Sequence, residues 1–284
     1  MTIEKALIWG IRELNKRQIE ESSLKVRMIL AHILNQKKEY LISHSADELS
    51  IKDENEFIKG IQKLKKNIPI QYITNSQEFM GFEFYVDENV LIPQPDTETL
   101  VIEVLEIAKK LKEEKKDCIR ILDLCTGSGA IGISISKILG DGVLVTCSDI
   151  SKEALKIVEI NSQKNHANIG IIESDMFENI NRKFDIIVSN PPYIETSIIK
   201  TLDREVKYEP KLALDGGKDG LKFYRKITDK SKEYLNNGGF IAVEIGYNQK
   251  EKVTNLFECY NYRNIYSKKD LAGNDRVVVA NIDK

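Results

Sequence analysis

The chain has 284 residues, a formal net charge of −2 and an isoelectric point of about 6.1. This length allows one large or two modest domains, and the charge excludes the global basic field of a nucleic-acid-binding protein. Four cysteines without C-x-x-C spacing and three scattered histidines show no metal-site signature, so we expect no metal. No apolar run approaches a membrane span and the start lacks a signal-peptide pattern, so we expect a cytoplasmic protein without a membrane partner.

Residues 1–75 are predicted to form a helical domain. Apolar residues fall at helical spacing in two stretches, which begin at Ile3 and at Leu24. Neither stretch carries a catalytic constellation, so these side chains are expected to form a core. Residues 76–95 are predicted to form a connector, in which aromatic residues alternate around Gly81 as in a short β-hairpin.

Residues 96–284 are predicted to form an α/β domain. Asp96 or Thr97 is expected to cap its first helix. From Ile119 onward, strand and helix patterns alternate, as in a doubly wound sheet. The expected strands cover residues 119–124, 142–147, 169–172, 184–189, 239–245 and 276–280, with a helix expected over residues 131–139.

A glycine-rich loop follows the first of these strands. Gly127-x-Gly129-x-x-Gly132 matches the dinucleotide-binding fingerprint, whose glycines let backbone approach a ligand closely. Asp149 follows about 20 residues later, where an acid that binds ribose hydroxyls is expected, and it could also cap the next helix. These features favour a nucleotide-type cofactor without specifying which one.

Two details favour S-adenosylmethionine over a dinucleotide. Asp123 lies in the strand just before the loop, where an acid is unfavourable beside a pyrophosphate but suits the cationic amino group of the methionine part. Its alternative role is to tether the loop. Cys125 and Thr126 also delay the first glycine, which makes a wider turn than a pyrophosphate usually needs.

A third short strand is followed by the segment Asp175-Met176-Phe177. Asp175 is expected to accept a hydrogen bond from the adenine amino group, with Met176 or Phe177 against the ring. An ordinary loop with a core-facing Phe177 explains the same residues equally well.

The tetrapeptide Asn190-Pro191-Pro192-Tyr193 follows an apolar strand. Two prolines cannot continue a central strand, so the chain leaves the sheet here in a stiff, extended turn. A primary amide needs two acceptors for its two N–H groups, and the Asn190 side-chain oxygen and the Pro191 carbonyl can supply them, with Tyr193 covering a flat face. The tetrapeptide is predicted to hold a planar –NH2 group, although strand termination alone also explains it.

These motifs, in this order, resemble a class I S-adenosylmethionine-dependent methyltransferase of the amino-acceptor type. The segments from Val90 to Glu98, from Tyr208 to Leu221 and from Asp270 to Val278 narrow the resemblance to the HemK/PrmC family of protein-(glutamine-N5) methyltransferases. The resemblance implies a Rossmann-like doubly wound sheet with an antiparallel last strand and a small N-terminal helical bundle that docks the substrate. It also implies that the chain methylates the glutamine in the Gly-Gly-Gln loop of release factors, with S-adenosyl-L-homocysteine as product. We expect a monomer and no direct nucleic-acid partner.

The resemblance also assigns roles to individual residues. The cofactor-binding residues it implies are Asp123, Cys125, Thr126, Gly127, Ser128, Gly129, Asp149, Ile150, Asp175, Met176 and Asn190. The residues implied for catalysis and substrate binding are Asn190, Pro191, Pro192 and Tyr193. The chain departs from the family pattern at Gln94, where arginine is usual, at Cys125, where glycine is usual, and at Met176, where an aromatic residue is common.

Alternative functions fall into other classes. The tetrapeptide is shared with enzymes that methylate the amino groups of adenine or guanine in nucleic acids, and with ribosomal-protein glutamine methyltransferases. The literal glycine fingerprint also matches a nicotinamide oxidoreductase, which Asp123 and the two prolines argue against. A non-catalytic binding protein that kept the fold is the fourth alternative, which the intact Asn190 and Tyr193 argue against.

Overall fold

The computed structural model describes residues 1–114 and 118–283, which form two units. The first, here called the helical unit, comprises Met1–Ser76 and the short segment Asp203–Tyr208. The second, here called the sheet unit, comprises the other described residues from Gln77 on. The sequence did not indicate that a segment after the tetrapeptide belongs to the helical unit.

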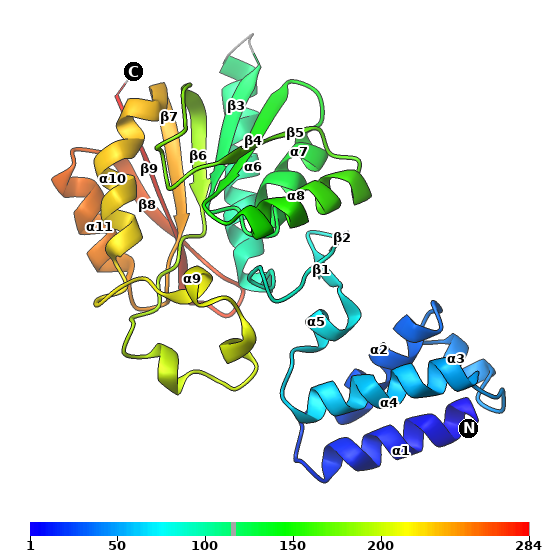
Figure 1. Cartoon of the computed structure of the whole chain (residues 1–284). Helices are drawn as coiled ribbons and strands as arrows, with labels where there is room; N and C mark the ends of the chain where they lie inside the picture. The colour runs from blue at the N-terminus through cyan, green and yellow to red at the C-terminus, as the bar shows by residue number, and fades with distance from the viewer. Residues whose placement is uncertain (115–117, 284) are drawn as a thin grey trace. The chain divides into compact units, whose positions relative to one another are not determined.

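The helical unit has a core of its own, in which Leu14, Leu30 and Phe57 are fully buried. Its elements are α1 (Ile3–Asn15), α2 (Ser22–Ile33), α3 (Tyr40–Ser43), α4 (Ile51–Lys65), α5 (Ile70–Thr74) and the 3-10 helix η3 (Val206–Tyr208) (Figure 1).

The segment 203–208 is held in the helical unit by polar contacts. Lys25 Nζ lies 2.9 Å from Glu205 Oε1, and the Tyr208 hydroxyl donates to the Lys66 carbonyl at 2.7 Å. These contacts involve side chains from distant parts of the sequence, which explains why local patterns did not predict them.

Within the described residues, the sheet unit is built on a seven-stranded sheet with the order β5-β4-β3-β6-β7-β9-β8. The strands are parallel except β9, which runs antiparallel to both of its neighbours. This arrangement confirms the predicted doubly wound sheet with an antiparallel last strand. The strand bounds are β3 (Ile119–Leu124), β4 (Val143–Asp149), β5 (Ile169–Glu173), β6 (Phe184–Ser189), β7 (Leu235–Glu244), β8 (Arg263–Lys269) and β9 (Asp275–Asn281).

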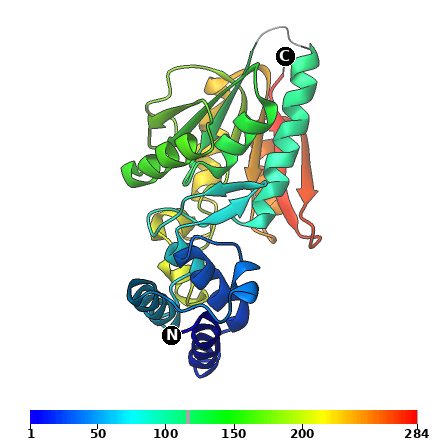
Figure 2. The ribbon, with the colours of Figure 1, turned by 90° about the vertical axis from the view of Figure 1, so that its right-hand side faces the viewer.

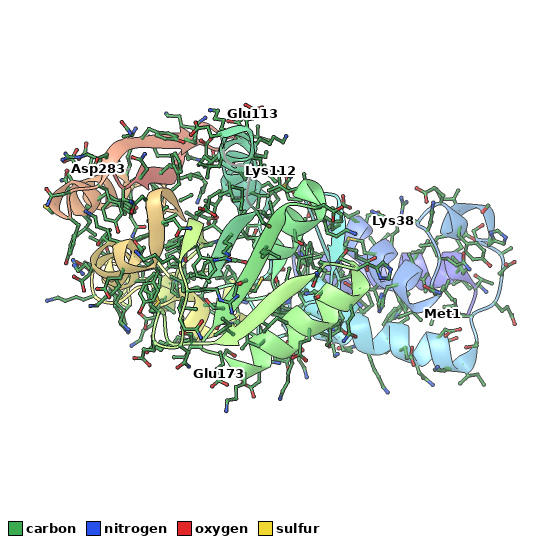
Figure 3. All side chains as sticks on the ribbon, turned by 90° about the horizontal axis from the view of Figure 1, so that it is seen from above. Met1, Lys38, Lys112, Glu113, Glu173 and Asp283 are labelled. Atoms are coloured by element: carbon green, nitrogen blue, oxygen red, sulfur yellow. The ribbon has the colours of Figure 1, made fainter. Side chains whose placement is uncertain are left out.

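Helices cover both faces of this sheet (Figures 1 and 2). Successive strand residues point to opposite faces, so Ile121 packs in one core and Leu122 in the other. Charged side chains such as Glu113 and Asp283 lie exposed on the outside (Figure 3). The helices on the first face are α6 (Glu98–Glu114), α7 (Ala130–Leu139) and α8 (Lys152–Lys164), and those on the second are α10 (Lys222–Tyr234) and α11 (Lys250–Cys259).

The remaining elements are short and connect the larger ones. They are β1 (Gln77–Phe79), β2 (Phe82–Phe84), the 3-10 helices η1 (Pro95–Thr97) and η2 (Ile199–Thr201), and α9 (Lys211–Leu214). The antiparallel pair β1 and β2 matches the expected hairpin.

Three local predictions differ from the structure. Asp96 and Thr97 were expected to cap a helix, but they form part of the 3-10 turn η1. The Asp96 side chain pairs with Arg276, and the Thr97 hydroxyl accepts from Asn190. β7 begins earlier than expected, because Leu235 pairs with Phe184 before an irregularity in the ladder. β8 was not predicted, because its mostly polar, partly exposed residues lack a clear apolar alternation. Among the described helices, none is long and apolar enough to cross a membrane.

Candidate active site

A pocket lies at the carboxyl edge of the sheet, around the point where the strand order reverses between β3 and β6. The loops that follow β3, β4, β5 and β6 contribute to its lining. The predicted residues that line it are Cys125, Thr126, Gly127, Ser128, Asp149, Ile150, Asp175, Met176, Asn190 and Pro192. The predicted residues that lie outside this lining are Asp123, Gly129, Pro191 and Tyr193.

The glycine loop is shaped by its own backbone. Gly129 has φ +80° and its N–H donates to the Thr126 carbonyl at 2.9 Å, which turns the chain into α7. Glycine reaches this left-handed conformation without the penalty of a side chain. Gly132 lies so close to β4 that a Cβ on it would come within 2.5 Å of Cys147 Sγ. Gly129 therefore allows the turn, and Gly132 allows α7 to pack closely on β4.

Asp149 joins two of the loops. Its Oδ2 accepts from the Gly127 N–H and its Oδ1 from the Ser151 N–H, each at 2.9 Å. Burial raises the pKa of this carboxyl, and the two backbone hydrogen bonds act in the opposite direction. The cap of α8 is Ser151, whose hydroxyl accepts from the Ala154 N–H at 3.2 Å. Asp149 therefore does not cap α8, which was the alternative interpretation of this residue.

Asp123 lies in β3 just before the glycine loop, as expected, but its side chain faces the interior. It is fully buried, and its Oδ2 accepts from the Thr126 hydroxyl at 2.5 Å and from the Gly132 N–H at 2.9 Å. Burial raises its pKa to about 7. Since no part of Asp123 reaches the pocket, this geometry does not offer the predicted direct contact with an amino group. It favours the loop-tethering interpretation instead.

A buried asparagine that the sequence analysis missed supports the same loop. Asn161 of α8 has no exposed surface, and its Nδ2 donates to the carbonyls of Tyr85 and Ser128 at 3.0 and 2.9 Å. Its Oδ1 accepts from the Tyr85 N–H at 2.6 Å. The available signal was the position of a polar residue in the apolar stripe that Leu155 and Val158 define.

The loop after β5 supplies Asp175 and Met176 to the pocket. Asp175 Oδ1 lies 3.4 Å from Lys226 Nζ, and Met176 has φ +52°. Phe177 is 4% exposed and stacks on Tyr234 with ring centroids 4.8 Å apart. The core-facing interpretation of Phe177 is therefore correct, and the alternative of Phe177 against an adenine ring is wrong.

The tetrapeptide begins where β6 ends. Asn190 lines the pocket, and its Nδ2 donates to Thr97 Oγ1 at 3.3 Å. Both prolines are buried, and Pro192 also lines the pocket, whereas Pro191 does not. The tetrapeptide thus places one carboxamide at the pocket wall, with its –NH2 end engaged by the protein.

Tyr193 is not among the residues that line the pocket, and the expectation that it covers a planar group there stays a prediction. Its hydroxyl donates to Glu244 Oε1 at 3.2 Å, and its carbonyl accepts from Gln249 Nε2 at 3.0 Å. Burial and the neighbouring Glu244 raise the pKa of the Tyr193 hydroxyl. Tyr193 therefore anchors the tetrapeptide to the end of β7.

A buried charged group lies behind the tetrapeptide. Glu244 is 2% exposed, and burial raises its pKa to about 7. Nearby, Arg276 forms ion pairs of 3.0 Å with Asp96 of η1 and with Asp270. The sequence predicted Asp96 only as a possible helix cap, and it indicated no role for Arg276. Glu244 was treated only as the end of a strand.

The pocket suits a nucleoside-containing cofactor rather than a metal. Its backbone loop and the carboxylates of Asp149 and Asp175 offer hydrogen bonds, and Ile131, Ile150 and Met176 offer apolar surface. No group of three or more metal-binding side chains occurs among residues 1–114 and 118–283.

The strand order and the pocket at the carboxyl edge define a class I methyltransferase fold. The methyltransferase small domain family matches residues 104–205, and the PrmC N-terminal domain family matches residues 5–74. A solved 16S rRNA methyltransferase of T. thermophilus, in complex with AdoMet and guanosine, has a TM-score of 0.52 at 17% identity. The match covers 73% of this chain and 49% of that chain, and it shows a likeness of fold.

Relatives with greater similarity identify the family. The release factor glutamine methyltransferase of Clostridium acetobutylicum is 43% identical over 99% of this chain and 98% of its own length. The release factor glutamine methyltransferase of Clostridium botulinum is 38% identical over 99% of each chain. The chain therefore belongs to the release factor glutamine methyltransferase family, as the sequence motifs predicted.

Proposed function

We propose that this protein transfers a methyl group from S-adenosylmethionine to the side-chain nitrogen of the glutamine in the Gly-Gly-Gln loop of peptide-chain release factors. One observation carries the proposal: the Asn190 carboxamide lies at the wall of the cofactor-sized pocket with its Nδ2 engaged by Thr97. Its Oδ1 is therefore the end that can accept from an incoming amide. The names of the relatives support the choice of release factor as substrate.

The cofactor is proposed to occupy the pocket with its parts assigned to separate loops. Asp149 would bind the ribose hydroxyls, since a carboxylate at the end of the second strand suits a diol. Asp175 would accept from the adenine amino group, with Ile150 and Met176 against the ring. The backbone from Cys125 to Ser128 would line the methionine part of the cofactor. Asp123 would keep this loop in place through its hydrogen bond with Thr126.

The acceptor nitrogen needs positioning more than deprotonation. The lone pair of an amide nitrogen is delocalised into its carbonyl, and a neutral amide is very weakly acidic. Asn190 Oδ1 and the Pro191 carbonyl would hold its two N–H groups and direct the nitrogen at the electrophilic methyl group that the cofactor supplies. These hydrogen bonds strengthen as the nitrogen gains positive charge, so they stabilise the transition state more than the ground state. Positioning alone can supply roughly 7–11 kcal/mol in ideal cases.

The other assignments follow from this reaction. Residues 1–75 are proposed to dock the release factor, because the pocket itself is built from the sheet unit. Gln94 lines the pocket, and its Nε2 donates to the Ile92 carbonyl at 3.1 Å. Because a glutamine side chain is neutral, it offers no charge to the substrate. We propose that the enzyme acts as a monomer in the cytoplasm, where release factors work, and that S-adenosyl-L-homocysteine is its second product.

Mass spectrometry of a purified release factor, after incubation with the enzyme and S-adenosylmethionine, tests the proposal. We expect a gain of one methyl group on the glutamine of the Gly-Gly-Gln loop. No gain, with S-adenosylmethionine shown to bind, would reject this substrate. The same assay on ribosomal protein and on nucleic acid would then distinguish the alternative acceptors.

A further inference from the structure

The tetrapeptide is held at both of its ends. Before it, Ser189 lies in β6 between β3 and β7, and its hydroxyl donates to the Leu124 carbonyl at 2.6 Å. At its other end, the Tyr193 carbonyl accepts from Gln249 Nε2 at 3.0 Å. Each proline fixes its own φ, so few torsions remain free between these two ends. The direction of the Pro191 carbonyl therefore depends on how firmly the end at Tyr193 is held.

Gln249 joins three segments of the chain at this end. It is 6% exposed, and its Oε1 accepts from the Gly246 N–H at 2.9 Å in the loop after β7. Its Nε2 donates to the Tyr193 carbonyl and, at 3.3 Å, to the carbonyl of Gly220 in the loop before α10. A carboxamide has one acceptor end and one donor end, and here each end faces groups of the opposite kind. The partners of Gln249 therefore determine its orientation.

Two glycines of the segment between α9 and α10 lie against the backbone of Tyr193. A Cβ on Gly216 would come within 2.7 Å of the Tyr193 Cα and carbonyl carbon. A Cβ on Gly220 would come within 2.5 Å of the Tyr193 carbonyl oxygen and 2.6 Å of Gln249 Nε2. A side chain at either position would displace the backbone of Tyr193 or the carboxamide of Gln249. Glycine is therefore required here for close approach, which encloses the Tyr193 carbonyl.

We propose that Gln249 is a positioning residue for methyl transfer, because it fixes the backbone that presents the Pro191 carbonyl to the substrate amide. Gln249 is not among the residues that line the pocket, so it acts through Tyr193 and not by contact with cofactor or substrate. The inference rests on the proposed function, in which the Pro191 carbonyl accepts one N–H of the substrate amide. Without Nε2, the carbonyls of Tyr193 and Gly220 lose a donor, which favours another path of the backbone.

The first test compares Gln249→Met with Asn236→Leu in the full-length enzyme. Methionine has nearly the length of glutamine but lacks both hydrogen-bonding ends. Asn236 is the matched control, because its Nδ2 donates to Asp185 Oδ1 at 2.9 Å at the opposite end of β7. We expect Gln249→Met to lower kcat by about tenfold or more, with KM for the release factor and Kd for S-adenosylmethionine changed by less than about threefold. Asn236→Leu should keep the wild-type kcat.

The second test disturbs the same hydrogen bond from the glycine side. Gly220→Ala keeps Gln249 but places a methyl group against the Tyr193 carbonyl. Gly273→Ala is its control, because Gly220 and Gly273 both have positive φ, 71° and 85°, whereas a Cβ on Gly273 would meet nothing within 4 Å. Both variants carry backbone strain, but only the first contacts the tetrapeptide. We expect kcat to fall by about tenfold or more in Gly220→Ala and to stay near the wild-type value in Gly273→Ala.

Hydrogen exchange measures the same backbone independently of the reaction. The Ile194 N–H, directly after the tetrapeptide, donates to the Leu214 carbonyl at 3.0 Å. We expect exchange in residues 193–196 to be faster in Gln249→Met and Gly220→Ala than in the wild type, and unchanged in both controls. Wild-type exchange or wild-type kcat in these two variants would overturn the inference, and if one of them does not fold, the other decides. Absence of methylation by the wild-type enzyme would instead count against the proposed function.

Discussion

Cys125 and Met176 contact each other at the pocket wall, with Sγ 3.9 Å from Sδ. Both residues lie in loops that are proposed to bind the cofactor, and both were predicted from the sequence to depart from the family pattern. Both residues have positive φ, 60° and 52°, a conformation that costs a residue with a side chain roughly 1–2 kcal/mol. The two departures therefore form one local feature, in which a thiol and a thioether fill space between the loops after β3 and β5.

Substitution of Cys125 separates backbone strain from packing. Cys125→Gly and Cys125→Ala both remove the thiol, but only glycine adopts φ +60° without penalty. We expect the free energy of unfolding of Cys125→Gly to exceed that of Cys125→Ala by about 1 kcal/mol. Urea unfolding of the two variants measures the difference. Equal stability, or a more stable alanine variant, would contradict the assigned strain.

Asn190→Ala tests the central residue of the proposed site. Removal of the carboxamide removes an acceptor for the substrate amide, while the loops assigned to S-adenosylmethionine remain. We expect kcat for release-factor methylation to fall by about 10²-fold or more, the scale seen when one preorganised transition-state hydrogen bond is lost. Calorimetry should give a Kd for S-adenosylmethionine close to that of the wild type. Asn255→Ala, at an exposed position of α11, is the control, and near-normal turnover of Asn190→Ala would reject the assignment.

Sequence patterns predicted the features that depend on neighbouring residues. The exit from β6 at Asn190 follows from two adjacent prolines, and the turn at Gly129 follows from glycine spacing. Both are local consequences of backbone chemistry.

The directions of individual side chains were harder to predict, because distant segments determine them. The Tyr193 hydroxyl donates a hydrogen bond to Glu244, which lies at the end of another strand. Asp123 faces inward because Thr126 and Gly132 fold back over it. The partnership of Thr97 with Asn190 joins segments that are 93 residues apart in the sequence, and no local pattern encodes it.

Asp123 makes the stability of the fold depend on pH. Its pKa is about 7 in the folded protein and about 3.9 in an unfolded chain, so the folded state binds more protons between these pH values. The stabilisation by the protonated group is fully present below about pH 4, and it is lost as the pH rises toward 7. We expect this group to lower the free energy of unfolding by at most about 1.4 kcal/mol per pH unit within that window.

Asp123→Asn isolates this contribution, because asparagine does not titrate and its oxygen can still accept from Thr126 and Gly132. We expect the free energy of unfolding of the variant to decline less between pH 5.5 and 7 than that of the wild type, by up to about 2 kcal/mol over the interval. Denaturant titrations at a series of pH values measure both proteins. Parallel pH profiles would show that Asp123 is ionised throughout.

Removal of residues 1–75 tests the helical unit as the docking module. The sheet unit contains its own two apolar cores and the whole pocket lining, so the truncated protein should still bind S-adenosylmethionine. The segment 203–208 loses its partners Lys25 and Lys66 in this truncation, which leaves the chain after the tetrapeptide without its anchors.

We expect the truncated enzyme to lose methylation of the intact release factor. If docking is the main role of the helical unit, the KM for the release factor should rise. A double substitution, Lys25→Ala with Tyr208→Phe, separates the two effects, because it releases the segment 203–208 but keeps the helices. If this variant methylates the intact factor normally while the truncated enzyme does not, the helices themselves bind the substrate. Equal rates for the full-length and truncated enzymes would show that the sheet unit recognises the release factor alone.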